Sequence, residues 1–456
     1  TTADFLGILP EMIIALTAFA VLTADMLLKR KTRIIPSLAL IGIAVAFVAT
    51  VTNMDLAGSY FRGFVKVDLY AHLFNLVFFI AAFFSTALAW AYMKDHPENR
   101  AEYYGLVLFS TVGMSLMGKA GDLLTVFLGL ELLSISLYVM VGFFRTDLKS
   151  NESGLKYLLL GAFSTGFFLY GMAFVYGSTG TTNLAEIASY VVANDVMNNV
   201  IFLMAIGLLL VGFGFKISMA PFHMWSPDVY EGAPTPATAY LSTGPKAAGF
   251  AALARVLVEA FQPAMAEIGT LIAILAVVTM IVGNVSALVQ TNIKRMLAYS
   301  SIAHAGYVLV AIAAGNAIGS AAVVYYLLAY TFMNLGAFAF IIYFEREKDQ
   351  HLNITDYNGL GYRHPLWAAC MAVFMFSLAG IPPTAGFFGK YYVFSAAIQE
   401  GMYWLVIFGV LNSLVSVYYY LRVVVGMYMY QPDPSLDMRG VKSMANALGQ
   451  EPVQVP

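Results

Sequence analysis

Three lysines and one glutamate lie inside apolar stretches of this sequence, where charged side chains are rare. Lys216, Lys246 and Lys390 are each deep in such a stretch, and Glu131 lies near the middle of another. A charge at the centre of a membrane-spanning helix costs about 2.5–3.5 kcal/mol on insertion scales, so several retained charges indicate a function. The chemistry that suits them is proton transfer, because a low dielectric disfavours the charged form and brings proton exchange within reach of neutral pH.

A buried ion pair that fixes helix packing is the plain alternative for Glu131 and one of the lysines. With three deep lysines and a single deep glutamate, the groups cannot all pair one to one. A row of titratable groups at mid-membrane depth is what a proton path requires. We therefore expect a proton path and keep the structural ion pair as the alternative.

Two further residues have both a functional and a structural interpretation. His304 lies beside Ser300 and Ser301 and could hydrogen-bond a water chain, but a lone histidine in a helix is more often a satisfied core residue. Lys156 is only a few residues into its predicted span, where a long side chain can reach the membrane surface. The same structural interpretation applies to Arg255 near the end of its span.

The composition is that of a polytopic membrane protein. Hydrophobic residues make up 60% of the chain, charged residues only 11%, and the mean hydropathy is +0.76. A soluble domain averages about 25% charged residues, so a soluble class is excluded. The formal net charge of -2 provides no basic face for nucleic acid. Neither a disulfide nor a four-thiolate iron-sulfur cluster can form from the single Cys370, so we expect no redox centre or metal in this chain.

Runs of about 20 apolar residues, the length that crosses a hydrocarbon core of about 30 Å, predict an all-α protein. We count thirteen candidate transmembrane helices. Residues 184–199 have helical apolar spacing and predict a short interfacial helix. The predicted spans are 5–28, 34–52, 69–93, 103–118, 122–144, 155–177, 200–222, 235–260, 267–290, 296–314, 319–344, 366–399 and 402–430.

Two of these spans are predicted to be broken helices. Pro221 interrupts the seventh, just after Lys216, and Pro382-Pro383 interrupts the twelfth, just before Lys390. Interrupted spans in corresponding positions mark the functional centre of an inverted repeat. We therefore expect an N-terminal three-helix segment (1–102), a five-helix repeat (103–260), a second, inverted five-helix repeat (261–430) and a polar tail (431–456).

The distribution of lysine and arginine predicts the orientation. With the N-terminus outside, the C-terminus of this chain lies inside after thirteen spans, and the inner loops and tail hold most of the basic residues. On the inner side we count Lys29, Arg30, Lys31, Arg33, Lys94, Arg100, Arg145, Lys149, Lys294, Arg295, Arg346, Lys348, Arg363, Arg439 and Lys442, against Arg62, Lys66 and Lys119 outside.

Three long motifs carry a family resemblance that covers nearly the whole chain. They are FKISMAPFHMWSPDVYEGAPTP (215–236), NIKRMLAYSSIAHAGY (292–307) and LAGIPPTAGFFGK (378–390). The sequence resembles the antiporter-like membrane subunits of respiratory complex I, the proton-pumping NADH-quinone oxidoreductase. Where related subunits tend to have glutamate, this chain ends its third motif on Lys390. The family usually has fourteen spans, whereas we count thirteen here.

The resemblance implies a proton-translocating subunit in the membrane arm of an oxidoreductase. It implies a Glu131–Lys216 pair, Lys156 as an intermediate relay, a central Lys246 and a terminal Lys390, with His304 as a possible further relay. Quinone, NADH, FMN and iron-sulfur clusters are then expected in other subunits, with none in this chain. The implied partners are neighbouring antiporter-like and small membrane subunits and the lipid bilayer, in a bacterial inner (plasma) membrane.

Two other classes of protein stay open. The chain could be a subunit of a stand-alone cation/proton antiporter or of a membrane hydrogenase, which share the antiporter-like fold. It could also be a secondary transporter of a small solute, although no substrate-sized cluster of mixed polar groups accompanies the lysines. Isolation of the native assembly distinguishes these classes by its other subunits.

Overall fold

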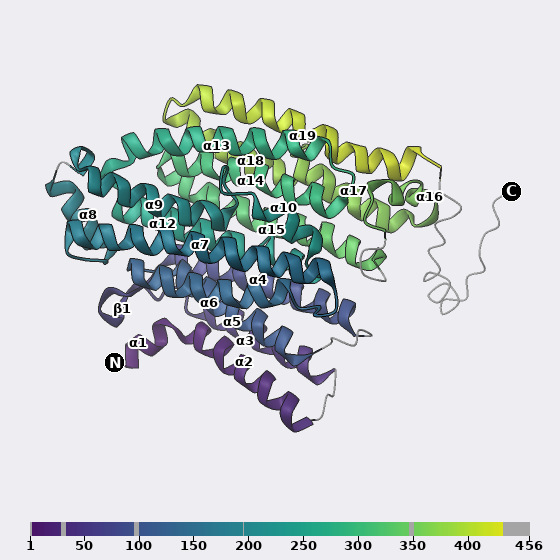
Figure 1. Ribbon diagram of the computed structural model, residues 1–456, viewed down its shortest axis with the longest axis horizontal. Helices are drawn as coiled ribbons and strands as arrows, with labels where there is room; N and C mark the ends of the chain where they lie inside the picture. The colour runs from purple at the N-terminus through teal and green to yellow at the C-terminus, as the bar shows by residue number, and fades with distance from the viewer. Residues whose placement is uncertain (1, 29–32, 95–99, 195, 346–350, 432–456) are drawn as a thin grey trace.

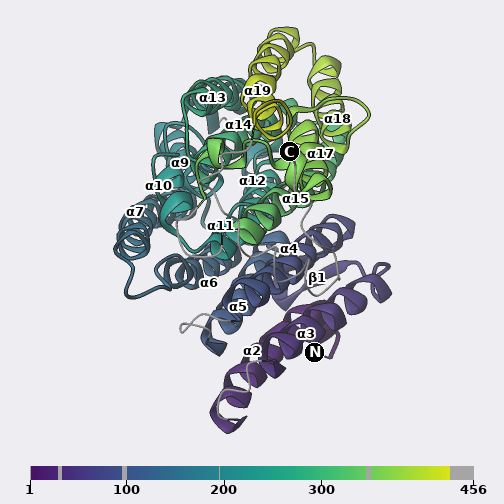
Figure 2. The ribbon, with the colours of Figure 1, turned by 90° about the vertical axis from the view of Figure 1, so that its right-hand side faces the viewer.

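The computed structural model describes residues 2–28, 33–94, 100–194, 196–345 and 351–431. Its long helices run side by side, with α2 and α3 at one edge and α19 at the opposite edge in both views (Figures 1 and 2). The elements are α1 (Thr2–Gly7), α2 (Leu9–Leu28), α3 (Ile34–Thr52), β1 (Gly58–Tyr60), β2 (Val65–Val67), α4 (Leu69–Met93), α5 (Ala101–Gly118), α6 (Leu123–Val141), α7 (Leu148–Thr179), α8 (Leu184–Ala193), α9 (Val200–Ile217), α10 (Trp225–Gly232), α11 (Thr235–Leu241), α12 (Gly244–Ala260), α13 (Met265–Leu288), α14 (Ile293–Ala314), α15 (Ala317–Phe344), α16 (Leu360–Arg363), α17 (Pro365–Ala379), α18 (Ala385–Gln399) and α19 (Tyr403–Met429).

The predicted all-α membrane class is confirmed. Among the described residues, ten helices are long and apolar enough to cross a membrane by length and composition. The count of thirteen spans stays a prediction. A short antiparallel hairpin, in which Gly58 of β1 pairs with Val67 of β2, was not expected. Some predictions fall outside the described residues. They concern the basic residues at 29–31, 346 and 348, which are expected on the inner side, and nearly all of the predicted polar tail.

The two predicted helix breaks are present, and the first lies further upstream than expected. Helix α9 ends at Ile217 rather than at Pro221. A proline ring clashes with the carbonyl four residues earlier, which here belongs to Ile217, so the helix must end there. Ser218 adopts a left-handed conformation with a φ of 60°, and the Met219 N–H donates to the Gly214 carbonyl at 2.7 Å.

The second predicted break separates α17 from α18, and a third break was missed. Gly380, with a φ of 84°, ends α17, and α18 begins at Ala385 after the two prolines. The predicted span 235–260 is also two helices, because α11 ends at Leu241, four residues before Pro245. The clash that ends α9 therefore ends α11 as well. As a result, each of the three deep lysines lies close to a helix interruption.

Helix α7 begins earlier than predicted, and helix α8 is present where a short helix was expected. Helix α7 begins at Leu148, earlier than the predicted residue 155, because the Asp147 side chain caps its first turn by accepting from the Ser150 N–H at 2.8 Å. The predicted short helix within residues 184–199 is present as α8, capped by Asn183. Its location at a membrane surface stays a prediction.

Helix α14 forms the centre of the second half of the molecule. It is 94% buried over its most apolar window, the highest value among the ten long apolar helices of the described residues. Gly283 of α13 lets the two helices approach closely, since a Cβ there would lie 2.4 Å from the Ala303 backbone nitrogen. Figure 2 shows α13 and α14 side by side among the C-terminal helices.

Changing Gly283 to alanine is expected to destabilise the protein by about 1–3 kcal/mol, because the backbone of α14 must shift to admit the methyl group. The measurement is the thermal unfolding midpoint of the detergent-solubilised protein. Gly207→Ala on α9 is the matched control, since a Cβ there meets nothing within 4 Å. Equal midpoints for the two variants would contradict the close approach of α13 and α14.

Candidate functional site: a row of buried lysines

Lys216 lies near the C-terminal end of α9 with only 5% of its surface exposed. Its Nζ donates to Ser134 Oγ of α6 at 2.9 Å. Ser134 follows Glu131 by three residues, so both lie on one face of α6. Oε1 of Glu131 has no hydrogen-bond partner among the described residues. The Glu131–Lys216 pair that the resemblance implies stays a prediction.

A small cavity lies beside this contact. Its volume is about 10 Å³, and the polar side chains of its lining are those of Ser134, Tyr138, Ser164, Thr165 and Lys216. That volume is close to what one water molecule needs, and these polar neighbours can satisfy its hydrogen bonds. The site can therefore pass a proton between Lys216 and a water without a rearrangement of helices.

Lys246 lies in the first turn of α12, directly after the unpredicted break, and is 3% exposed. Its Nζ donates to the Ser301 carbonyl oxygen at 2.9 Å and also to Ser301 Oγ. The Ser301 hydroxyl lies 3.4 Å from Tyr230 Oη. Lys216 packs on the same helix, because a Cβ at Gly249 would lie 3.2 Å from Lys216 Cγ. Helix α12 thus contacts one deep lysine and contains the next.

His304 lies one helical turn beyond Ser301 and is 3% exposed. Its Nδ1 lies 2.7 Å from Tyr326 Oη and its Nε2 lies 3.0 Å from Tyr420 Oη. A tyrosine hydroxyl both donates and accepts, so the ring is satisfied in either neutral tautomer. This geometry is compatible with the core role and with the relay role of His304.

Lys390 of α18 is 4% exposed and reaches back across the second predicted break. Its Nζ donates to the carbonyl oxygen of Ala379, the last residue of α17, at 2.8 Å and to Ser413 Oγ of α19 at 2.8 Å. It also lies 4.8 Å from the centroid of the Tyr307 ring. The free carbonyls and the negative end of the α17 dipole favour a cation at this position.

One face of α14 joins the second and third lysines. Ser301 contacts Lys246, His304 follows three residues later, and Tyr307, three residues further, contacts Lys390. The rings of His304 and Tyr307 are 5.8 Å apart and edge-on. The regular three-residue spacing of these polar side chains was visible in the sequence, but only the structure shows that a lysine lies at each end.

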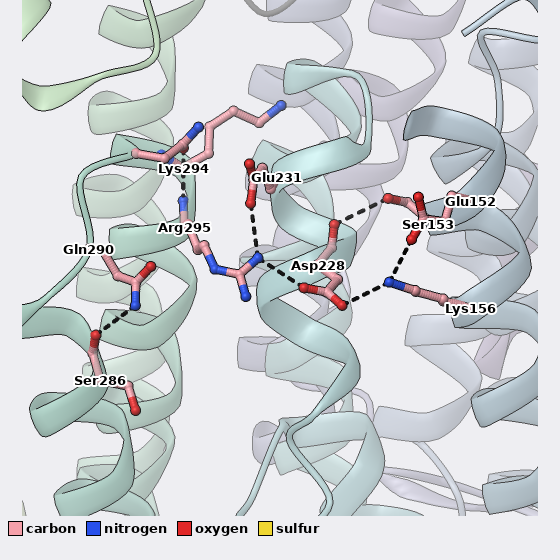
Figure 3. A network of polar contacts seen from close by, with 10 residues as sticks. Glu152, Ser153, Lys156, Asp228, Glu231, Ser286, Gln290, Lys294 and Arg295 are labelled. Carbon is pink, nitrogen blue, oxygen red and sulfur yellow. Dashed lines mark hydrogen bonds and ion pairs between the residues drawn. The ribbon is translucent and has the colours of Figure 1, made fainter. Parts of the chain in front are cut away.

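Lys156 lies apart from this row. Its side chain is 42% exposed, and its Nζ lies 2.7 Å from Glu152 Oε1 and 3.0 Å from Asp228 Oδ2. Asp228 Oδ1 in turn lies 2.9 Å from Arg295 Nη1, which also contacts Glu231 (Figure 3). The intermediate relay implied by the resemblance is therefore part of a partly exposed charge network that joins α7, α10 and α14.

Asp228 is the centre of this network. Partial burial raises the pKa of its carboxyl group, but the hydrogen bonds and charges of Lys156 and Arg295 outweigh that effect and hold the pKa below its usual value of 3.8. Because the pKa of Asp228 is lower in the folded state, its ionised carboxylate stabilises the fold above pH 3.8. This stabilisation is lost as the pH falls through the folded-state pKa.

Asp228→Asn is expected to lower the stability by about 1 kcal/mol at neutral pH, a modest value because the network is partly exposed and screened. Glu152→Gln removes only the contact with Lys156, which lies one turn away on the same helix. It is expected to lower the stability by about 0.3 kcal/mol. Thermal unfolding in low and high salt measures both. A loss from Asp228→Asn that is unchanged below about pH 4 would show that its charge is not the cause.

Three of the basic residues assigned to loops or helix ends are in fact buried and bonded. Lys119, expected in an outer loop, is fully buried and pairs with Glu11, and Lys294 is buried in the first turn of α14. Arg255, expected to reach the surface, is 3% exposed and forms two hydrogen bonds with Asp68 at 2.8 and 3.0 Å. These contacts hold α12 and α5 against the N-terminal helices, which single-helix patterns do not reveal.

The sequence also matches known proteins. Residues 120–416 match the family model described as "NADH:quinone oxidoreductase/Mrp antiporter, TM". A curated relative, NADH-quinone oxidoreductase subunit N of Trichlorobacter lovleyi, is 53% identical over 431 residues, which is 94% of this chain and 88% of the relative.

Two solved structures resemble the fold. A chain of respiratory complex I from Thermus thermophilus with bound aureothin is 33% identical with a TM-score of 0.79, covering 96% of both chains. A chain of the Mrp complex from Dietzia sp. is 22% identical with a TM-score of 0.84, covering 95% of this chain and 82% of that one, and shows the fold alone. With the buried lysines at broken helices, these matches establish that the chain belongs to the NADH:quinone oxidoreductase/Mrp antiporter transmembrane family.

Proposed function

We propose that the chain is a proton-translocating membrane-arm subunit of an NADH-quinone oxidoreductase, of the subunit N type. The observation that carries this proposal is the row Lys246, Ser301, His304, Tyr307 and Lys390, in which each member lies beside the next along α14. Proton transfer needs hydrogen-bonded or water-bridged steps between groups that can donate and accept. The Lys246–Ser301 step is a direct hydrogen bond, whereas the His304–Tyr307 and Tyr307–Lys390 steps are ring contacts that a water would have to bridge. Lys216 enters the row through α12, against which it packs.

The chemistry of electron transfer belongs to other subunits. Because the relatives are membrane subunits of an NADH-quinone oxidoreductase, we assign NADH, FMN, iron-sulfur clusters and quinone to partner subunits. This chain contacts neighbouring antiporter-like and small membrane subunits. It lies in a bacterial inner membrane, with its N-terminus outside.

The coupling step is a change of charge near Lys216. When Glu131 and Lys216 approach one another, the carboxylate stabilises the protonated lysine, and their separation favours release of the proton. Ser134 accepts a hydrogen bond from Lys216 and lies one turn beyond Glu131 on α6, so its hydroxyl can reorient when the lysine gains or loses its proton. The released proton passes toward Lys246 and then along α14 to Lys390, with the two five-helix repeats, 103–260 and 261–430, each holding part of the route.

A stand-alone cation/proton antiporter is the second candidate, because a chain of the Mrp complex shares the fold. The 53% identity to a curated NADH-quinone oxidoreductase subunit favours the first proposal. Native extraction in mild detergent, followed by identification of the co-purified subunits, distinguishes them. We expect subunits with flavin and iron-sulfur clusters to co-purify, whereas recovery of antiporter-type subunits alone would refute the oxidoreductase assignment.

A further inference from the structure

An open groove lies between α2, α5 and α6, and none of its lining residues belongs to the lysine row. Its volume is about 500 Å³, within the range of about 300–1,000 Å³ that is typical of sites for small organic ligands. Leu106, Phe109 and Val139 contribute apolar walls, and Arg100, Glu102 and Arg145 contribute its charged groups. The groove is therefore amphipathic, like a lipid.

The two arginines belong to the same end of the helical bundle. Arg100 immediately precedes α5, and Arg145 lies four residues past the last residue of α6. Because α5 and α6 are consecutive helices that pack side by side and run in opposite directions, the start of one lies beside the end of the other. The charged groups thus gather where helices of this length leave the hydrocarbon region.

Within the described residues, neither arginine has a carboxylate partner. In the part of the chain that the structure describes, no carboxylate lies within 4.0 Å of the Arg100 or Arg145 guanidinium. The hydrogen bond that Arg145 forms there is made by its backbone carbonyl, which accepts from the Asn151 side chain. With Glu102 at the same groove, the charged lining has one excess positive charge. A ligand with one negative charge and an apolar body complements both features.

We propose that this groove binds an anionic glycerophospholipid. Its phosphodiester lies between the Arg100 and Arg145 guanidinium groups, which donate hydrogen bonds to two phosphate oxygens in the planar geometry that suits phosphate. One acyl chain lies along Leu106, Phe109 and Val139, which form the apolar wall of the groove. Basic pockets between transmembrane helices are the expected binding sites of anionic headgroups. This inference is independent of the proton path.

The experiment uses the intact complex, purified in detergent, stripped of lipid and titrated with phosphatidylglycerol or phosphatidylcholine. Bound lipid is counted by native mass spectrometry. We expect phosphatidylglycerol to occupy one site, and we expect the double variant Arg100→Gln/Arg145→Gln to weaken this binding by about tenfold or more, because it removes both charged donors to the phosphate. Phosphatidylcholine, which has no net charge, is expected to bind this site more weakly.

Two matched variants separate this site from general effects of charge. Arg33→Gln removes an exposed arginine just before α3 that does not line the groove, and it is expected to leave lipid binding unchanged. Val139→Trp keeps every charge but fills the apolar wall, and it is expected to remove the bound lipid. Unchanged phosphatidylglycerol binding in the double arginine variant, as when a neighbouring subunit fills the groove, would overturn the proposal. Unchanged binding in Val139→Trp would overturn it too.

Discussion

Lys246→Ala is expected to slow proton transfer through this chain by at least about tenfold, because a positioned proton-transfer group contributes about 10²–10⁴-fold to a rate. Lys246 is the member of the row that donates to Ser301 of α14, so its removal opens a gap between Lys216 and His304. The measurement is the number of protons pumped per quinone reduced in reconstituted complexes.

Lys246→Arg is the matched control for the role of the charge alone. Arginine keeps the positive charge beside Ser301 but does not release its proton at any working pH. The pumping ratio of this variant is therefore expected to be as low as that of Lys246→Ala. Recovery of the wild-type ratio by arginine would show that Lys246 only places a fixed charge, and the proton row would lose its central member.

The second large effect concerns folding and not proton transfer. Lys119→Met is expected to destabilise the N-terminal helices by about 3–5 kcal/mol, because it leaves the carboxylate of Glu11 buried without its partner. Lys119 Nζ lies 2.8 Å from Glu11 Oε1 and donates to the Gly7 carbonyl at 2.9 Å, with side-chain exposures of 1% and 3% for the pair. Thermal unfolding and the yield of assembled complex measure the loss.

The double variant Lys119→Met/Glu11→Leu tests the cause. Replacing a whole buried ion pair by apolar side chains is often neutral, whereas removal of one partner is not. We expect the double variant to regain most of the stability, less the cost of leaving Asn75 without its 2.9 Å hydrogen bond to Glu11. If the double variant is as unstable as Lys119→Met, the loss comes from packing and not from an unpaired charge.

The sequence alone predicted the helical class, the burial of three lysines and two of the three breaks next to them. These features follow from local causes, which are apolar length for a span and the missing N–H and bulky ring for a proline break. Pro245 was as visible as Pro221, and the same rule applied to it would have predicted the break before Lys246. The break was not predicted because residues 235–260 are apolar over enough length to form one continuous span.

The contacts across helices were less predictable. Glu131 and Ser134 lie on one face of α6, and sequence spacing cannot decide which of them meets Lys216. The same limit applies to Lys119, because its partner Glu11 lies 108 positions away in the chain. Relative rotation and depth of neighbouring helices decide such pairs, and neither quantity is encoded in the pattern of a single helix.

The most direct test of the proton row is the complex carrying Lys216→Ala, in which quinone reduction and proton pumping are measured together on the same vesicles. Lys216 is the first deep lysine, and it donates to Ser134, which lies on the same helix as Glu131. We predict that the number of protons pumped per quinone reduced falls below the wild-type value while the assembled complex still binds quinone. Full retention of wild-type pumping in Lys216→Ala would contradict the account.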